Sequence, residues 1–481
     1  MLYHSTRSDY LTADSAQAVL KGLAPDGGLY MPGEIPAFDW QKCLNGSAQE
    51  MSVMILSALL PDIPHMDTLV KNAYTGKFET EELTPTVPVG DFHVLELFRG
   101  PTSAFKDVAL CMLPQLLTAA KREQGMDKDI LILTATSGDT GKAALSGFQD
   151  VPGVKICVFY PHGGVSQVQR AQMVTQEGEN VTVCAVHGNF DDAQTGVKNI
   201  FAACQGKDLP FALSSANSIN IGRLAPQIMY YFKAYRDLLD TGKIKLGYEV
   251  NFSVPTGNFG DILAGYLAKK LGLPVGRLIC ASNANKVLTD FIRTGTYDRR
   301  RPLHKTDSPS MDILVSSNLE RLLYLLSGDC ELVASLMKQL NEQGFYTVPD
   351  SQKAAIDAEF WADFAGDEAA AATIRRVWEK NGYLCDTHTA VGWAVAENYV
   401  NHTGDHRPLV VLSTASPYKF PKAVLEAIGG DLSGDEFTLM ERLEALTNVP
   451  TPKNLATLKG KPERHTGVID KEQMLKFVLG L

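Results

Sequence analysis

The sequence predicts an α/β fold in which mostly parallel strands are covered by helices, preceded by a helical N-terminal region. From about residue 92, short apolar runs typical of strands alternate with longer segments whose apolar residues recur every three or four positions. The same alternation resumes near residue 250. Strands that alternate with helices of this length favour a parallel sheet with both faces covered.

The elements follow in order along the chain. Residues 1–90 are mostly helical, and the prolines of residues 84–88 mark the first boundary. In the first α/β segment we expect strands at 94–98, 130–133, 154–160, 181–186 and 212–213, and helices from Lys106 and at 167–177, 191–204 and 224–239. In the second we expect strands at 250–254, 277–281 and 408–412, and helices at 261–271, 318–327, 352–380, 423–428 and 471–479.

These elements suggest four regions. They are an N-terminal helical region (1–90), an α/β domain (91–245), a second α/β domain with a helical insertion (246–430) and a C-terminal tail that packs on the core (431–481). A chain of 481 residues is long enough for two or three such units and a large core.

Composition restricts the kind of partner. The net charge of −10 argues against nucleic-acid binding, which usually needs a basic face. The longest apolar runs are far shorter than a membrane span, and no signal peptide is evident, so we expect a cytoplasmic protein without a membrane partner. The 8 cysteines are scattered and none has metal-ligand spacing, which favours free, mostly buried thiols in a reducing compartment and no metal site.

Lys106 lies in the most informative segment. It follows a Gly100-Pro101 turn and Phe105, and it begins a helical pattern that Pro114 interrupts. A lysine between an aromatic ring and a buried helix face would be desolvated, which lowers the amine pKa and makes it nucleophilic toward carbonyls. Taken alone, a solvated lysine that caps the turn is the more common case.

Two loops have the composition of anion sites. Residues 134–141 and residues 254–261 each follow an apolar strand and precede a helix. Small residues let backbone N–H groups approach an anion, and the following helix adds the positive end of its dipole. Neither loop matches a nucleotide-binding motif. Because these loops and the Thr414 turn all follow strands, one cleft at the carboxyl ends of the strands could contain all three.

Seven segments in order resemble threonine synthase, a family of pyridoxal-phosphate enzymes with the tryptophan-synthase-β-like fold (fold type II). Arg99 and Ser416 depart from the resemblance, because many relatives carry histidine at both places. The matching segments are residues 22–30, 96–106, 137–141, 217–220, 255–261, 308–313 and 414–417.

The resemblance implies a pyridoxal 5'-phosphate cofactor and a role for each loop. Lys106 would form the Schiff base with the cofactor and carry out the catalytic proton transfers. Thr414 would meet the pyridine nitrogen, where a hydroxyl can donate or accept. Thr256 would also bind the cofactor, and the cofactor phosphate would be held by the backbone amides of Gly257, Asn258, Phe259 and Gly260.

The implied reaction converts O-phospho-L-homoserine and water into L-threonine and phosphate, the last step of threonine biosynthesis. Arg223 is the first candidate for the substrate phosphate, followed by Asn220 and Lys419. His388 is better explained as helix-start packing than as a base. Asp139 could cap its helix or face the cofactor's 3'-oxygen. The substrate carboxylate would be received by Ser137, Gly138, Asp139 and Thr140.

Two other functions remain open at this point. A serine/threonine dehydratase would share the cofactor and the lysine but would need no second phosphate site. A phosphate- or nucleotide-binding protein without enzymatic activity would leave Lys106 as an ordinary surface residue. No obligate protein partner is evident in the sequence.

Overall fold

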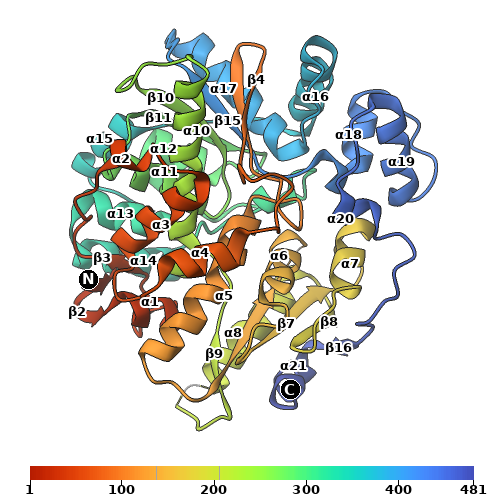
Figure 1. Cartoon of the computed structure of the whole chain (residues 1–481). Helices are drawn as coiled ribbons and strands as arrows, with labels where there is room; N and C mark the ends of the chain where they lie inside the picture. Colours follow the sequence, from red (N-terminus) through yellow and green to blue (C-terminus); the bar gives the residue numbers. More distant parts are fainter. Residues whose placement is uncertain (137, 205) are drawn as a thin grey trace.

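The computed structural model describes residues 1–136, 138–204 and 206–481, and most strands in them lie in two sheets (Figure 1). The sheet with order β14-β11-β10-β15-β5-β4 is parallel except for its β4–β5 hairpin, and the sheet with order β16-β8-β7-β6-β9 is parallel throughout. The predicted fold class is confirmed. The first sheet contains β4 (Thr86–Val89), β5 (Phe92–Glu96), β10 (Val250–Pro255), β11 (Val275–Ser282), β14 (Phe360–Phe364) and β15 (Leu409–Ser413). The second contains β6 (Asp129–Ala135), β7 (Val154–Pro161), β8 (Val181–His187), β9 (Phe211–Ser214) and β16 (Val468–Asp470).

Helices cover both sheets. Strands β10 and β15 are buried at every residue, as expected for central strands with covered faces. Among the helices, α5 contacts α1, α4, α6 and α9 and has most of its residues buried. The main helices are α5 (Lys106–Glu123), α6 (Asp139–Phe148), α7 (Gln167–Val174), α8 (Phe190–Cys204), α10 (Ile228–Asp240), α11 (Gly260–Lys270), α12 (Val287–Thr294), α13 (Leu319–Ser327), α14 (Cys330–Gln343), α17 (Thr387–Thr403), α18 (Pro421–Ala427) and α19 (Glu436–Thr447).

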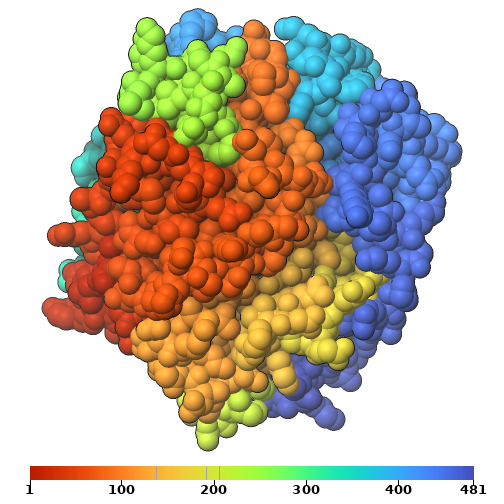
Figure 2. All heavy atoms as spheres, viewed as in Figure 1, coloured from red at the N-terminus to blue at the C-terminus, as the bar shows by residue number. Residues whose placement is uncertain are grey.

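The N-terminal region is less helical than predicted. Helices α1 (Ser15–Lys21), α3 (Ala48–Leu59) and α4 (Met66–Tyr74) are present, but β1 (Tyr3–Ser5), β2 (Ser8–Ala13) and β3 (Tyr30–Pro32) form a small antiparallel sheet beside them. These strands are too short to show a period in the sequence. In Figure 2 this region covers the left of the visible face, whereas C-terminal residues form the right.

Two predicted helices are interrupted. The segment 352–380 contains α15 (Asp350–Glu359), strand β14 and α16 (Asp367–Asn381), because five residues between two helices pair with β11. The segment 224–239 is divided by Pro226, which cannot continue a hydrogen-bonded helix. It therefore contains the end of α9 (Ile221–Leu224), a short 3₁₀ turn and α10.

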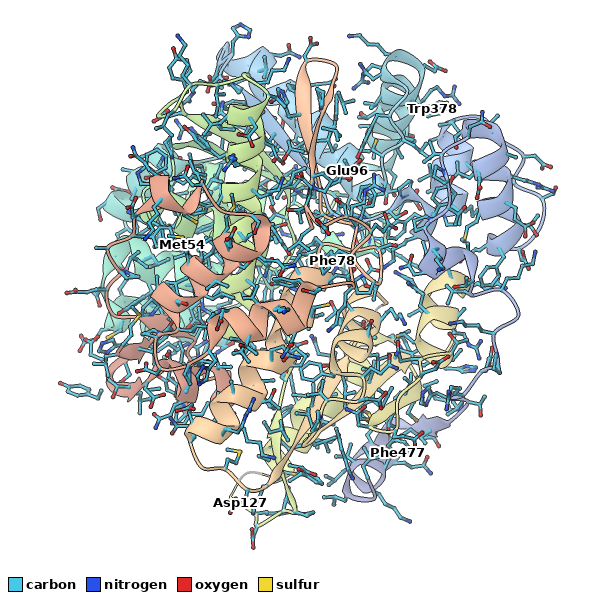
Figure 3. The ribbon with its side chains drawn as sticks, in the orientation of Figure 1. Met54, Phe78, Glu96, Asp127, Trp378 and Phe477 are labelled. Carbon is cyan, nitrogen blue, oxygen red and sulfur yellow. The ribbon has the colours of Figure 1, made fainter. Side chains whose placement is uncertain are left out.

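The four predicted regions remain a proposed division, and two strands cross it. Strand β5 pairs with β15 of the first sheet although it lies within 91–245, and β16 of the tail pairs with β8. Near β16, α21 (Met474–Leu479) carries Phe477 (Figure 3). The Phe477 ring packs against that of Phe159, with ring centroids 6.0 Å apart. The C-terminal tail therefore completes the smaller sheet and its core.

The prediction that the cysteines are free, mostly buried thiols is confirmed. All 8 cysteines are free and buried. Within the residues described, no helix is long and apolar enough to cross a membrane.

Candidate active site

The turn before Lys106 and the turn containing Thr414 lie side by side. The Phe105 N–H donates to the Thr414 carbonyl at 2.8 Å, and the Ser416 N–H donates to the Ser103 carbonyl at 3.1 Å. Because β5 and β15 are parallel neighbours, their carboxyl ends bring these two turns together.

Asp107 shapes the turn from within. Its carboxylate accepts the Thr102 N–H at 2.9 Å and the Thr102 hydroxyl. A Cβ at Gly100 would lie 2.5 Å from the Asp107 side chain, so only glycine fits there. The turn that presents Lys106 is therefore built around a buried carboxylate.

Lys106 begins α5, and its side chain is buried. Its Nζ donates to Ser310 Oγ at 3.3 Å, lies 3.9 Å from Asp139 Oδ2 and sits 4.6 Å from the centre of the Phe105 ring. Burial lowers the Lys106 pKa to about 8, although the nearby Asp139 carboxylate opposes the shift. Such an amine is partly deprotonated near neutral pH and can act as nucleophile or base.

Asp139 pairs with a second buried lysine. Its Oδ1 lies 2.7 Å from Lys419 Nζ and accepts from Gln169 Nε2 at 3.0 Å. Burial disfavours the carboxylate, but Lys419 and Lys106 outweigh burial and hold the Asp139 pKa well below its ordinary value. The N-cap of α6 is Gly138, without a side-chain cap, so the capping role considered for Asp139 is not what its side chain does.

The rest of the loop around Asp139 is tightly packed. Gly138 has φ 142°, and a Cβ there would lie 2.4 Å from Gln169. Thr136 Oγ1 accepts the N–H groups of Gly138 and Gly141 at 3.0 and 2.9 Å, which fixes the backbone where α6 begins. Thr140 is half-buried on the same turn, and Ser137 lies outside the described residues.

The loop at 256–260 presents backbone N–H groups at the start of α11. Phe259 adopts a left-handed conformation with φ 64°. Carbonyls of the loop are engaged, because Gly257 O accepts from Ser316 Oγ at 2.8 Å and Asn258 O accepts from the Asn318 N–H at 3.0 Å. Within the described ranges, the N–H groups of residues 257–260 donate to no protein acceptor. This combination suits a phosphate at a helix N-terminus.

Thr256 and Thr414 are both buried near these turns. The Thr256 hydroxyl donates to its own strand, at 2.6 Å from Val254 O. Thr414 follows β15, and its carbonyl holds Phe105 in place, which puts Thr414 next to the Lys106 turn.

Arg223 and Asn220 differ in what their side chains do. One Arg223 Nη donates to Ala216 O, whereas its buried Nε has no hydrogen-bond partner among the described residues. Burial lowers the Arg223 pKa to about 10, and its positive charge helps to lower the Lys106 pKa. Asn220 instead caps α9 through the Gly222 N–H at 2.8 Å and donates to Val19 O at 2.8 Å. The structure therefore does not bring the Asn220 amide to the Lys106 cluster.

Ser310 is a site residue for which the sequence predicts no role. It lies in a segment that carried the family resemblance, but nothing local links it to Lys106, which is 204 positions away. Asp312 anchors this loop by accepting from Asn283 and Asn285 at 2.8 and 2.9 Å. Lys419, a secondary candidate in the sequence, is fully buried at the cluster.

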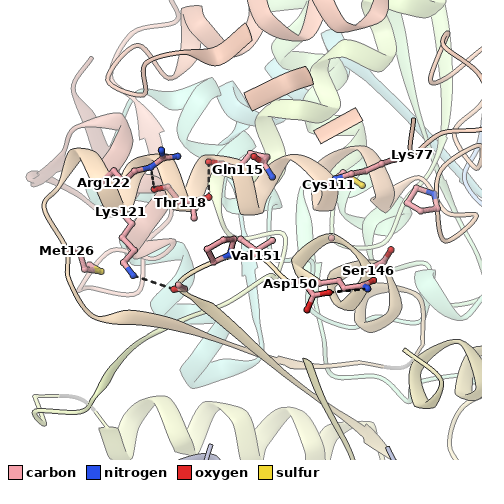
Figure 4. Close-up of a pocket in the computed structure, with 15 residues that line it drawn as sticks. Lys77, Cys111, Gln115, Thr118, Lys121, Arg122, Met126, Ser146, Asp150 and Val151 are labelled. Carbon is pink, nitrogen blue, oxygen red and sulfur yellow. Dashed lines mark hydrogen bonds between the residues drawn. The ribbon is translucent and has the colours of Figure 1, made fainter. Parts of the chain in front are cut away.

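A separate cavity of about 930 Å³ lies between α5 and α6 (Figure 4). Lys77, Cys111, Arg122 and Val151 are among its lining residues, and none of the candidate site residues lines it. Arg99, one of the departures from the resemblance, is half-buried and paired with Glu96 at 2.6 Å and with Glu79 at 3.1 Å.

Comparisons with known proteins show the family to which the chain belongs. The chain matches three family descriptions: "Pyridoxal-phosphate dependent enzyme" over residues 78–414, "Threonine synthase N terminus" over 2–74 and "Threonine synthase, C-terminal" over 389–478. It is 39% identical to threonine synthase from Pseudomonas aeruginosa, covering 94% of this chain and 96% of that protein.

Two further comparisons concern coverage and fold. The chain is 38% identical to threonine synthase-like 1 from Homo sapiens over 86% of its own length but only 58% of that protein. The crystal structure of pyridoxal-phosphate-bound threonine synthase from Brucella melitensis matches with a TM-score of 0.88 and 38% identity, covering 100% of this chain and 98% of that chain.

Proposed function

Because the chain belongs to the threonine synthase family of pyridoxal-phosphate-dependent enzymes, we propose that it converts O-phospho-L-homoserine and water into L-threonine and phosphate. The observation that carries the substrate assignment is Arg223, a guanidinium that is 4% exposed, has no ion pair within the described residues and leaves its Nε without a hydrogen-bond partner there. Its charge lies close enough to Lys106 to help lower the Lys106 pKa. A buried cation without a carboxylate is costly unless an anion arrives to pair with it.

The residues present fit the cofactor. Lys106 Nζ would hold it covalently, the N–H groups of residues 257–260 would receive its phosphate, and Thr414 would approach its pyridine nitrogen. A Cβ at Gly257 would lie 2.6 Å from the Ser310 carbonyl, so the loop can take this close-packed course only with glycine. When bound, the cofactor supplies an electron sink that stabilises negative charge on substrate carbons.

Lys106 is the proton carrier of the proposed reaction. With a pKa of about 8, its Nζ can accept the proton of the substrate α-carbon and then move a proton at the β-carbon. Asp139 favours the protonated form of this amine, whereas burial favours the neutral form. The amine is thereby balanced between the two states that successive proton transfers need.

The loop around Asp139 would receive the substrate carboxylate. The start of α6 provides a favourable dipole, and Lys419 offsets the charge of Asp139. Arg223 would donate to the phosphate while it leaves the γ-carbon, before water adds at the β-carbon. Charge-assisted hydrogen bonds of this kind strengthen as charge develops on the leaving group.

The test measures products from purified protein loaded with cofactor. Incubation with O-phospho-L-homoserine should release phosphate and L-threonine in equal amounts. A dehydratase would instead form a 2-oxo acid and ammonia from serine or threonine and leave the phosphate ester intact. That second outcome would overturn the proposed substrate while leaving the family assignment in place.

A further inference from the structure

A chain of hydrogen bonds connects the buried start of α17 to the candidate catalytic amine. Asp386 Oδ2 lies 2.7 Å from His388 Nδ1, and the Ser310 N–H donates to His388 Nε2 at 3.1 Å. Ser310 Oγ in turn accepts from Lys106 Nζ at 3.3 Å. Asp386 and His388 are 0% and 2% exposed, so water does not compete with the bond between them. Ser310 is half-buried, and its two bonds lie at the edge of this buried pair.

The partners of His388 define its tautomer. A carboxylate can only accept, so Nδ1 must carry the proton that it donates to Asp386. The remaining nitrogen, Nε2, then has a lone pair and can accept the Ser310 N–H. The Asp386 carboxylate is itself fixed, because it caps α17 by accepting the N–H groups of His388 and Thr389 at 2.9 and 3.1 Å.

Ser310 occupies the space between the two halves of the candidate site. Its hydroxyl faces Lys106, and its carbonyl lies against Gly257 in the proposed phosphate loop, 2.6 Å from where a Cβ would be. The ring of His388 packs on Phe420, with centroids 5.0 Å apart, which limits its movement. A shift of the Ser310 backbone would therefore disturb both the amine and the loop.

We propose that Ser310 is a catalytic residue that orients Lys106 Nζ, and that His388, fixed by Asp386, is the positioning residue that holds Ser310 in place. The hydroxyl accepts from the ammonium form of Lys106 and can donate to its neutral form, so it keeps contact in both protonation states. This proposal rests on Lys106 being the reacting amine, as proposed above, and does not depend on which amino acid is the substrate.

Two substitutions of His388 separate its two bonds. In His388→Gln, the side-chain oxygen can reach the position of Nε2 and accept the Ser310 N–H, but the bond to Asp386 is lost. In His388→Asn, the shorter amide can still donate to Asp386 from the position of Nδ1, but it cannot reach Ser310. Both variants remove the ring, so a role in packing alone would affect them alike.

The expected results differ between the pair. His388→Asn and Ser310→Ala should each lower kcat by about tenfold or more with little change in substrate KM, the signature of a group that acts on the reacting atoms rather than in uniform binding. His388→Gln should keep a kcat much closer to that of the wild type, because its amide oxygen can still accept the Ser310 N–H. In addition, the double variant His388→Asn/Ser310→Ala should have the same kcat as Ser310→Ala, because both changes act through the same contact between Ser310 and Lys106. Equal losses in the two His388 variants, or additive losses in the double variant, would overturn the proposal.

A measurement independent of turnover uses the wild-type protein with histidines labelled with ¹⁵N. At pH 7.5, the His388 ring should show a protonated Nδ1 and an unprotonated Nε2, assigned by the signal that His388→Gln lacks. A protonated Nε2 could not accept from Ser310 and would overturn the proposal even if every variant were inactive. Because this spectrum needs no substrate, failure of the proposed reaction and failure of this inference can be distinguished.

Discussion

Replacement of Arg223 by glutamine removes the cation on which the proposed substrate assignment depends. Glutamine is neutral and shorter, so the change removes the charge together with the Nη bond to the Ala216 carbonyl, and cofactor retention serves as the check that the site still folds. The change deletes up to two charge-assisted hydrogen bonds to the substrate phosphate, each contributing about 1.5–3 kcal/mol. Since about 1.4 kcal/mol corresponds to a factor of ten, turnover of phosphohomoserine should fall by roughly 10²- to 10⁴-fold.

The assay records threonine and the absorption of the bound cofactor in the same sample. Cofactor absorption should persist in Arg223→Gln, because it depends on Lys106 and the loop at 257–260. Arg99→Gln is the matched control, since Arg99 is half-exposed and already paired with Glu96 and Glu79, and its turnover should stay close to that of the wild type. Undiminished turnover in Arg223→Gln would refute the reasoning, and parallel loss of turnover and cofactor would make Arg223 a structural residue.

Two further predictions concern the loop and the electrostatics of the site. Gly257→Ala should weaken cofactor binding far more than Gly260→Ala, because the new Cβ would lie 2.6 Å from the Ser310 carbonyl at the first position but 3.6 Å from its nearest neighbour at the second; similar affinities would contradict this. Asp139→Asn should shift the Lys106 pKa further below about 8, since the carboxylate is the main charge that stabilises the ammonium form. The pH dependence with which cofactor-free protein captures pyridoxal phosphate measures that pKa, and a value that stays or rises would contradict the assignment.

The sheets were predictable because their strands are apolar runs bounded by turn residues, which is local information. Strand β10, for example, is a buried run followed directly by a glycine loop. Strand β14 was missed because its five residues lie between two helical segments and gain their stability from pairing with β11, far away in sequence. The small N-terminal sheet was missed for the same reason.

The candidate site divides in the same way. Lys106 and the two loops could be proposed from the sequence because each lies in one short segment whose glycine, proline or small polar residues predict a turn before a helix. The roles of Ser310 and Lys419 depend on side chains that meet Lys106 and Asp139 only after folding. Asn220 was predicted to bind substrate, whereas its side chain caps α9. Asparagine is a strong N-cap residue, so this role was readable from the local sequence.

The central claim is that Lys106 is the amine that holds the cofactor. Borohydride reduction of the loaded protein fixes the cofactor to that amine, and mass spectrometry of the digested protein then identifies the modified peptide. Lys142 and Lys419 are informative alternatives, because Lys419 is fully buried at the same cluster and burial lowers the Lys142 pKa to about 8 as well. We predict the modification on Lys106 alone; its presence on Lys142 or Lys419, or on no lysine, would contradict the account.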